Sequence, residues 1–238
     1  PDSILEIDEK NYLSFSPRLI RFGSSGLAGV WAEENTRESI YNAFRRKETF
    51  GTSGPRIKVR FFAGYNFEST DLNDPDLIKD AYSKNIPMGG DIIRQKVKNP
   101  KFLVWAISDP LGAPLQRVQI IKGWLTDGEQ REKVFDVACS DGQSVNPLNH
   151  RCPDNGARVN LDDCSISRDK GNAEIKTFWQ DPEFSNDQEA FYYARVLENP
   201  TCRWSTWDAV RAEVDPRSDI PNIIQERAWS SPIWILDS

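Results

Sequence analysis

Short, strand-sized runs of apolar residues recur after residue 55 and set the class of fold that the chain can adopt. Each run is rich in Val, Ile, Phe, Tyr or Trp and is bounded by Gly, Pro, Asp or Asn, the pattern typical of strands between turns. The clearest runs cover residues 57–62, 102–107, 118–121, 134–138, 191–197 and 229–235. Residues 58–61 alternate charged and apolar side chains, which favours a strand with one face in water. The sequence therefore predicts a mainly β chain, arranged as an antiparallel β-sandwich.

The segment before these strands has a different character. Residues 1–24 show no regular pattern, whereas residues 36–47 have the apolar spacing of a helix that ends in three basic residues. Asn35 is the predicted N-cap, with Glu38 as its capping-box partner. We therefore predict two parts, residues 1–54 with the helix 36–47 and residues 55–238 forming the β-sandwich.

Two shorter helices are predicted within the β-rich part. Residues 76–83 have a helical pattern, and residues 207–213 form a second helix with Ser205 or Thr206 as its N-cap. The acidic run at residues 71–76 lacks the glycine and the closing glutamate of an EF-hand calcium loop. We interpret that run as a turn before the first of these helices.

The cysteines Cys139, Cys152, Cys164 and Cys202 all lie in the second half of the chain. Their spacing does not match the closely paired ligands of a zinc site. An even number of cysteines in polar, Gly- and Asp-rich segments instead indicates two disulfides, and disulfides persist in oxidising compartments. Three pairings are possible, and we favour Cys139 with Cys152 and Cys164 with Cys202. This interpretation predicts a periplasmic or extracellular location with long disulfide-bearing loops.

Charge and hydropathy exclude two classes of partner. The formal net charge of −6 argues against a nucleic-acid partner, because phosphate binding requires a basic face. The longest apolar runs, such as residues 102–107, have the length of a strand, so no transmembrane segment is predicted. The sequence does not indicate an oligomeric state.

Known catalytic motifs do not occur in the sequence. His150 is the one histidine, so a histidine-rich metal centre or a Ser-His-Asp triad would depend on it alone. A loop histidine between two disulfide cysteines is more often simply solvated. Neither a nucleophile-elbow motif nor a phosphate-binding glycine loop is present. No metal ligand and no cofactor-binding residue is therefore predicted within this chain.

Carboxylates before the first helix are the remaining candidates for chemistry. Glu33 and Glu34 are adjacent and lie close in sequence to Arg37. Such a group could line a polar site in which Arg37 binds an anionic substrate. The alternative is that both acids stabilise the helix dipole and pair with Arg37 on the surface. Glu33, Glu34 and Arg37 are thus the candidate catalytic residues.

Tryptophans gather toward the end of the sequence. They are Trp204, Trp207, Trp229 and Trp234. Exposed tryptophans in a sandwich can form a platform on which sugar rings stack, although tryptophan more often belongs to the core. This cluster supports an alternative function, a binding or assembly module for glycans or proteins.

Longer sequence phrases resemble a known family. Residues 26–40 read GLAGVWAEENTRESI and residues 45–62 read RRKETFGTSGPRIKVRFF. Further phrases are IPMGGD at 86–91, FLVWA at 102–106, QIIKGW at 119–124, AFYYARVLE at 190–198, RW at 203–204 and QERAWSSPIW at 225–234. Over residues 19–235 the chain resembles the C-terminal part of a bacterial family known as domain of unknown function 3604.

The resemblance implies an exported protein related to the PHP (polymerase and histidinol phosphatase) superfamily of metal-dependent hydrolases. It implies that the N-terminal part of the parent is an α/β barrel that holds divalent metals through His and Asp ligands. Residues 26–52 would then be the last helical element of that barrel. The ligand motifs do not occur in this sequence, so the divalent metal is expected in the N-terminal part.

The first residue and the methionine content favour the same interpretation. The chain begins at Pro1, and its single methionine is Met88, so we expect that it has been cut from a longer protein. The expected partner is the missing N-terminal part, packed against Trp31, Ile40 and Phe44. The chain would support the barrel and contribute to the rim of its phosphoesterase-type site.

Overall fold

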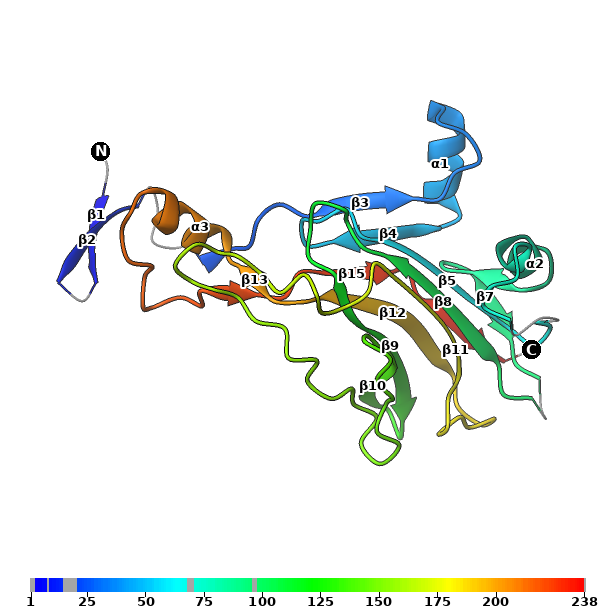
Figure 1. Ribbon diagram of the computed structural model, residues 1–238. Coiled ribbons are helices and arrows are strands. Elements are labelled where there is room, and N and C mark those ends of the chain that lie inside the picture. The colour runs from blue at the N-terminus through cyan, green and yellow to red at the C-terminus, as the bar shows by residue number, and fades with distance from the viewer. Residues whose placement is uncertain (1–2, 8, 15–20, 68–70, 96–97, 238) are drawn as a thin grey trace.

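Strands dominate the computed structural model, which describes residues 3–7, 9–14, 21–67, 71–95 and 98–237 (Figure 1). The larger of two main sheets has eight strands. They are β3 (Leu27–Val30), β4 (Thr49–Thr52), β7 (Asp91–Ile93), β9 (Leu115–Thr126), β10 (Glu129–Cys139), β12 (Ala190–Glu198), β15 (Arg227–Ser230) and β16 (Ile233–Leu236). The smaller sheet has four strands, β5 (Lys58–Gly64), β6 (Ile86–Pro87), β8 (Lys101–Ile107) and β11 (Glu174–Gln180).

Antiparallel pairing connects most neighbours in these sheets. The larger sheet follows the order β10-β9-β12-β15-β4-β3, and β16 lies between β12 and β7. The smaller sheet follows the order β11-β8-β5-β6. Among the described strands only the pair of β16 with β7 is parallel. The prediction of a mainly β, antiparallel fold is confirmed.

A single apolar core lies between the two sheets. The smaller sheet contributes Phe61 from β5 and Phe102 from β8, whose rings stack with centroids 5.7 Å apart. The larger sheet contributes Ile120 from β9 and Tyr192 from β12. On β12 every second residue from Ala190 onward is buried, because successive side chains of a strand point to opposite faces. The two sheets are called the two-sheet body below.

One helix covers the outer face of the smaller sheet. This helix is α2 (Leu77–Lys84), and its buried residues Leu77 and Ala81 pack against Phe62 and Leu103. Residues 76–83 were predicted to be helical, and the observed helix is displaced by one residue. Its amphipathic spacing explains both its formation and its position on the sheet.

A second helix, α1 (Arg37–Arg45), stands away from the two-sheet body at the upper right of Figure 1. The predicted N-cap Asn35 is wrong. Thr36 has the extended backbone of an N-cap, and its hydroxyl accepts a hydrogen bond from the Ser39 amide. Only Ala43 of the helix is fully buried, whereas Tyr41 and Phe44 are 60% and 51% exposed.

The third helix, α3 (Trp204–Arg211), begins three residues before its predicted start. The predicted caps Ser205 and Thr206 are wrong, because both lie inside the helix and its N-cap is Arg203. The Thr206 hydroxyl instead donates to the carbonyl of Asn222. A contact distant in sequence therefore holds this end of the helix.

Several strands differ from the prediction. Part of the N-terminal segment that seemed irregular forms a hairpin of β1 (Ser3–Ile7) and β2 (Lys10–Ser14). A further two-stranded sheet joins β13 (Thr201–Cys202) to β14 (Ile223–Ile224). The run 229–235 is not one strand but the ends of β15 and β16, separated at Pro232, which has no amide hydrogen to donate.

The larger sheet extends across the boundary that the sequence suggested near residue 54. β3 pairs with β4, and β4 pairs with β15 through Thr52, Gly51 and Phe50. The strands on either side of α1 are thus part of the same sheet as the C-terminal strands. No helix in the described part of the chain is long and apolar enough to cross a membrane.

Candidate functional sites

The base of α1 forms a polar pocket together with β5 and α2. It has a volume of about 360 Å³ and is lined by Trp31, Ala32, Glu33, Arg46, Glu48, Arg60 and Tyr82. We call it the arginine pocket. Of the three candidate catalytic residues it contains Glu33. Arg46, Glu48, Arg60 and Tyr82 were not predicted as site residues, because they come from separate elements and share no motif.

Arg60 is held in the arginine pocket by two aromatic side chains. Its guanidinium carbon lies 3.5 Å from the centroid of the Trp31 ring, and its Nη1 donates to the Tyr82 hydroxyl at 2.5 Å. The Trp31 indole donates to the Val59 carbonyl at 2.8 Å, which fixes the ring against β5. Trp31, expected to pack on a missing partner, is thus already in contact with the two-sheet body.

Two carboxylates hold the second arginine. Arg46 Nη2 lies 3.0 Å from Glu33 Oε1 and 3.4 Å from Glu48 Oε2. Glu48 is 4% exposed and also accepts a hydrogen bond from the Tyr82 hydroxyl. Burial, followed by the contact with Glu48, raises the pKa of the Tyr82 phenol, which therefore stays protonated.

Glu33 itself is ionised and exposed. The pKa of its carboxyl group is lowered by hydrogen bonds from its own backbone amide and the Ser39 hydroxyl, and by Arg46. Glu34 and Arg37 do not line the pocket; both are exposed, and the Glu34 amide donates to the Ser39 hydroxyl at 3.1 Å. The structure brings Glu33 together with Arg46 rather than with Arg37.

A larger groove crosses the end of the two-sheet body where β9, β12 and β16 run side by side. Its volume is about 840 Å³. Its lining comprises Gly123, Trp124, Leu125, Gln130, Arg131, Glu132, Asp187, Gln188, Glu189, Ala190, Phe191, Trp234 and Asp237. We call it the aromatic groove. Its polar side chains lie beside three aromatic rings, the combination that sugar-binding surfaces use.

Strand register explains the aromatic groove. Phe191 on β12 lies directly opposite Gly123 on β9 and Trp234 on β16. A side chain on Gly123 would collide with the Phe191 ring, so the ring occupies space that is free because residue 123 is a glycine. The Phe191 and Trp234 ring centroids are 4.9 Å apart, and Trp234 remains 42% exposed.

The tryptophans that are close in sequence do not form one platform. Trp234 lines the aromatic groove, whereas Trp204 and Trp207 belong to α3, far from the C-terminus (Figure 1). Trp229 is half-buried in β15. Trp124, which the sequence did not single out, lies in the groove because β9 passes beside the end of β12.

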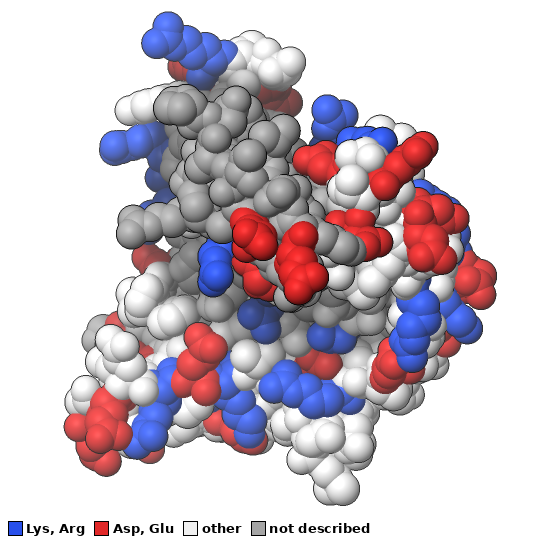
Figure 2. Space-filling view, turned by 90° about the vertical axis from the view of Figure 1, so that its left-hand side faces the viewer, with Lys and Arg blue, Asp and Glu red and all other residues white. Residues whose placement is uncertain are grey.

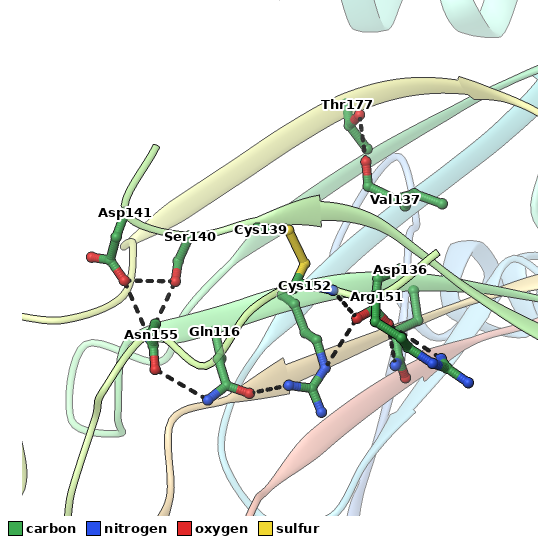
Figure 3. The surroundings of a disulfide bond; sticks show 12 residues. Gln116, Asp136, Val137, Cys139, Ser140, Asp141, Arg151, Cys152, Asn155 and Thr177 are labelled. Atoms are coloured by element: carbon green, nitrogen blue, oxygen red, sulfur yellow. Dashed lines mark hydrogen bonds and ion pairs between the residues drawn. A yellow bond between two sulfur atoms is a disulfide. The ribbon is translucent and has the colours of Figure 1, made fainter. Parts of the chain in front are cut away.

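Two disulfides, Cys139–Cys152 and Cys164–Cys202, fasten the long segment between β10 and β11. The favoured pairing is confirmed. Figure 3 shows buried Asp136 beside the first disulfide, where its carboxylate accepts from the Cys152 amide at 2.7 Å. The guanidinium of Arg151 lies 3.6 Å from the same carboxylate. These contacts indicate a structural role for the surroundings of this disulfide.

His150 has contacts that fit a structural residue. Its ring packs edge-on against Phe135 with centroids 5.1 Å apart, and its Nε2 lies 4.0 Å from Glu183. Within the described part of the chain, no three His, Cys, Asp or Glu residues are grouped so that they could hold a metal ion. On the face shown in Figure 2, acidic and basic side chains are interspersed.

The structure thus defines a two-layer, mainly β protein with two disulfides and separate surface pockets. The family described as "Protein of unknown function (DUF3604)" matches the chain over residues 4–237. The chain belongs to this family. No curated protein and no solved structure matches it.

Proposed function

We propose that this chain is the β-sandwich portion of an exported, PHP-like metal-dependent hydrolase, and that the arginine pocket forms part of its substrate site. The observation that carries the proposal is the pair of arginines, Arg46 and Arg60, held at the base of α1 beside Glu33. Family membership and the sequence resemblance support it. Helix α1, which stands away from the two-sheet body, would pack against the barrel.

The arginine pocket suits an anionic substrate. Guanidinium groups bind phosphate and carboxylate oxygens through paired N–H donors, and the Tyr82 hydroxyl adds a third polar group at the same place. Glu33 and Glu48 hold Arg46 in position without burying it, because its side chain is 44% exposed. These side chains would bind and orient a phosphate ester at the rim of the site.

The residues that the structure describes do not themselves fit a metal centre. The described residues contain no suitable group of three ligands, and the arginine pocket pairs each carboxylate with a guanidinium or a phenol. The arginine pocket would therefore bind and orient the substrate without a metal ion of its own. The divalent metal would be bound by the N-terminal part of the parent protein.

The partner for this portion would be that N-terminal part. Tyr41 and Phe44 on α1 expose large apolar side chains on a helix with one fully buried residue. Burying such side chains would stabilise an interface. The two disulfides support an exported location, because they require an oxidising compartment.

Denaturing intact-mass analysis of the purified protein, with metal content measured alongside, is the first test. We expect the sample to contain an upstream polypeptide of the same parent and bound divalent metal together with this chain. Finding the 238-residue chain alone and free of metal would contradict the proposal.

A matched pair of variants tests the arginine pocket in the parent protein. Arg46→Met removes a guanidinium of the pocket and should lower kcat/KM for p-nitrophenyl phosphate by about tenfold or more. Arg45→Met changes the neighbouring exposed arginine, which does not line the pocket, and should leave kcat/KM nearly unchanged. Equal effects of the two substitutions would remove the arginine pocket from the substrate site.

A second candidate function, glycan binding, is favoured by the aromatic groove. The exposed face of Trp234 lies beside Phe191, and Gln130 and Gln188 offer amide hydrogen bonds. Affinity electrophoresis against xylan and mixed-linkage β-glucan tests this function. Trp234→Ala should abolish the retardation, whereas Trp207→Ala, a similarly exposed tryptophan outside the groove, should preserve it.

A further inference from the structure

A third cavity lies where α3, the second disulfide and the end of β12 meet. It has a volume of about 540 Å³. Its lining comprises Pro55, Leu111, Gly112, Ala113, Asp163, Cys164, Ser165, Ile166, Arg168, Glu198, Thr201, Trp207 and Glu226. We call it the Glu198 cavity. It shares no lining residue with the arginine pocket or the aromatic groove.

Glu198, the last residue of β12, is a buried carboxyl group with an unused oxygen. Its side chain is 1% exposed, and its Oε2 accepts a hydrogen bond from the Ala113 amide at 3.4 Å. Its Oε1 has no hydrogen-bond partner. Gly112 lies close to this oxygen, and a Cβ added to the glycine would be 2.9 Å from it. Burying an oxygen without a hydrogen-bond partner costs free energy. A ligand that donates a hydrogen bond to Oε1 would therefore be stabilised here.

The position of Glu198 is fixed by its backbone. Its backbone amide donates to the Glu226 carbonyl at 3.0 Å, and its carbonyl accepts from the side-chain Nε2 of Gln225 at 3.1 Å. Leu115 on β9 lies opposite Glu198, where the register between β9 and β12 shifts. The carboxyl group is therefore held at the wall of the cavity by the ends of two strands.

Negative charge predominates around this carboxyl group. Glu226 accepts a hydrogen bond from the Ser53 hydroxyl, and Asp109 accepts from the amides of Arg56 and Leu111. Burial raises the pKa of Asp109, but these two amides and the Arg56 charge outweigh it and leave the pKa lowered.

The remaining charges at the cavity come from the loop that carries the second disulfide. The pKa of Asp163 is lowered by hydrogen bonds from Ser165, so this carboxylate is also ionised. Arg168 lies at the rim, where its Nη1 donates to the Gly112 carbonyl at 3.3 Å. Arg56 is exposed and does not line the cavity, although its charge contributes to the lowered pKa of Asp109.

We propose that the Glu198 cavity binds a primary ammonium group on a short apolar stem, with Glu198 as its carboxylate partner. An ammonium group has three N–H donors, which can satisfy the free Oε1 and remain close to Glu226 and Asp163. Leu111, Ile166 and Trp207 give the cavity an apolar wall for the stem. The aromatic face of Trp207 adds attraction for a cation.

Binding is coupled to the release of one proton. Burial, followed by the charges of Asp109 and Glu226, raises the pKa of Glu198 to about 8, against the effect of the Ala113 amide. The carboxyl group is therefore mostly protonated at neutral pH. An ammonium ligand takes the place of this proton, which passes to the solvent, and no bond in the ligand changes.

Isothermal titration calorimetry with n-butylammonium tests the proposal. Alkylammonium groups stay charged at pH 9, so a change in affinity reports on the protein. The dissociation constant should fall by about 30-fold between about pH 6.5 and about pH 9, as Glu198 ionises. At the lower pH, buffers of different ionisation enthalpy should reveal the release of nearly one proton per ligand.

Two variants locate the site. Glu198→Gln resembles the protonated carboxyl group in shape and charge, so the fold should persist while n-butylammonium binding is lost. Trp234→Ala, in the aromatic groove, should bind n-butylammonium like the unsubstituted protein. Urea denaturation of each variant confirms that it is folded.

Several results would overturn the proposal. They are the absence of n-butylammonium binding at millimolar concentration, an affinity independent of pH, and unchanged binding by Glu198→Gln. Calcium binding that Glu198→Gln abolishes would also overturn it, because the site would then hold a metal ion instead of an organic cation.

Discussion

Lys122 and Asp181 form a buried ion pair that connects the two sheets of the body. Lys122 Nζ on β9 lies 2.7 Å from Asp181 Oδ2, and the two side chains are 3% and 0% exposed. The Tyr192 hydroxyl donates to the same carboxylate oxygen at 2.7 Å. Burial and this carboxylate raise the pKa of Tyr192, which keeps its proton for the contact.

Removing one partner of this pair should therefore be costly. We expect Lys122→Met to lower the free energy of unfolding by about 3–5 kcal/mol, because Asp181 would be left as an uncompensated buried charge. Lys133→Met removes the exposed ion pair with Glu183 and should cost less than about 1 kcal/mol. Urea denaturation measures both values. Similar losses in the two variants would contradict the structural role given to Lys122.

Glu198 makes stability depend on pH in the opposite sense to most carboxylates. Its pKa is about 8 in the folded protein and 4.5 ordinarily, so the folded state holds a proton that the unfolded chain has lost. Between these values its contribution to stability falls as pH rises, by up to about 1.4 kcal/mol per pH unit. The contribution is greatest below about pH 4.5, where both states are protonated.

Glu198→Gln removes this dependence. The difference in free energy of unfolding between the variant and the unsubstituted protein should grow in favour of the variant from about pH 5.5 to about pH 8. Urea denaturation at several pH values measures it. A constant difference across this range would show that the carboxyl group is not protonated in the fold.

At the scale of elements, the two disulfides close loops of different length. Cys139–Cys152 spans a separation of 13 residues, and Cys164–Cys202 spans 38. Loop-closure entropy predicts a loss of about 3 kcal/mol for Cys139→Ala/Cys152→Ala and about 4 kcal/mol for Cys164→Ala/Cys202→Ala. Thermal or urea unfolding of the two double variants checks the order. The reverse order would show that contacts such as the Asp136–Cys152 hydrogen bond outweigh loop length.

The strands were predictable wherever one face is buried. β5, β8 and β12 carry dense apolar runs that remain visible without a structure. β9 extends at both ends of the predicted run, because Gln116 and Lys122 are buried through hydrogen bonds to distant residues. Such partners leave no local pattern in the sequence.

The pockets were less predictable than the strands for a related reason. Glu33 was noticed because it precedes a helix, but Arg46, Arg60 and Tyr82 meet it only through the pairing of separate elements. Glu198 appears in the sequence as the end of an ordinary strand. Its distinctive feature, a buried oxygen without a partner, follows from the placement of Gly112 and Ala113.

At the scale of the whole molecule, stability should be unevenly distributed. β9 and β12 lie inside the larger sheet and pair with neighbours on both sides. Among the described strands, β1 and β2 pair only with each other. An isolated two-stranded hairpin is marginally stable. We therefore expect the slowest amide hydrogen exchange in β9 and β12 and the fastest among the strands in β1 and β2. Comparable protection of the hairpin would indicate that it is docked on a surface.

The pairing of β4 with β15 has a consequence for how the protein is made. Residues 50–52 find their partners at residues 228–230, close to the end of the chain. The larger sheet cannot be completed until the ribosome has synthesised residue 230. Until then, β4 of a nascent chain would keep one edge without its sheet partner. A premature stop codon before β15 would leave both β4 and β12 with open edges, and the truncated product should aggregate rather than survive as a smaller domain.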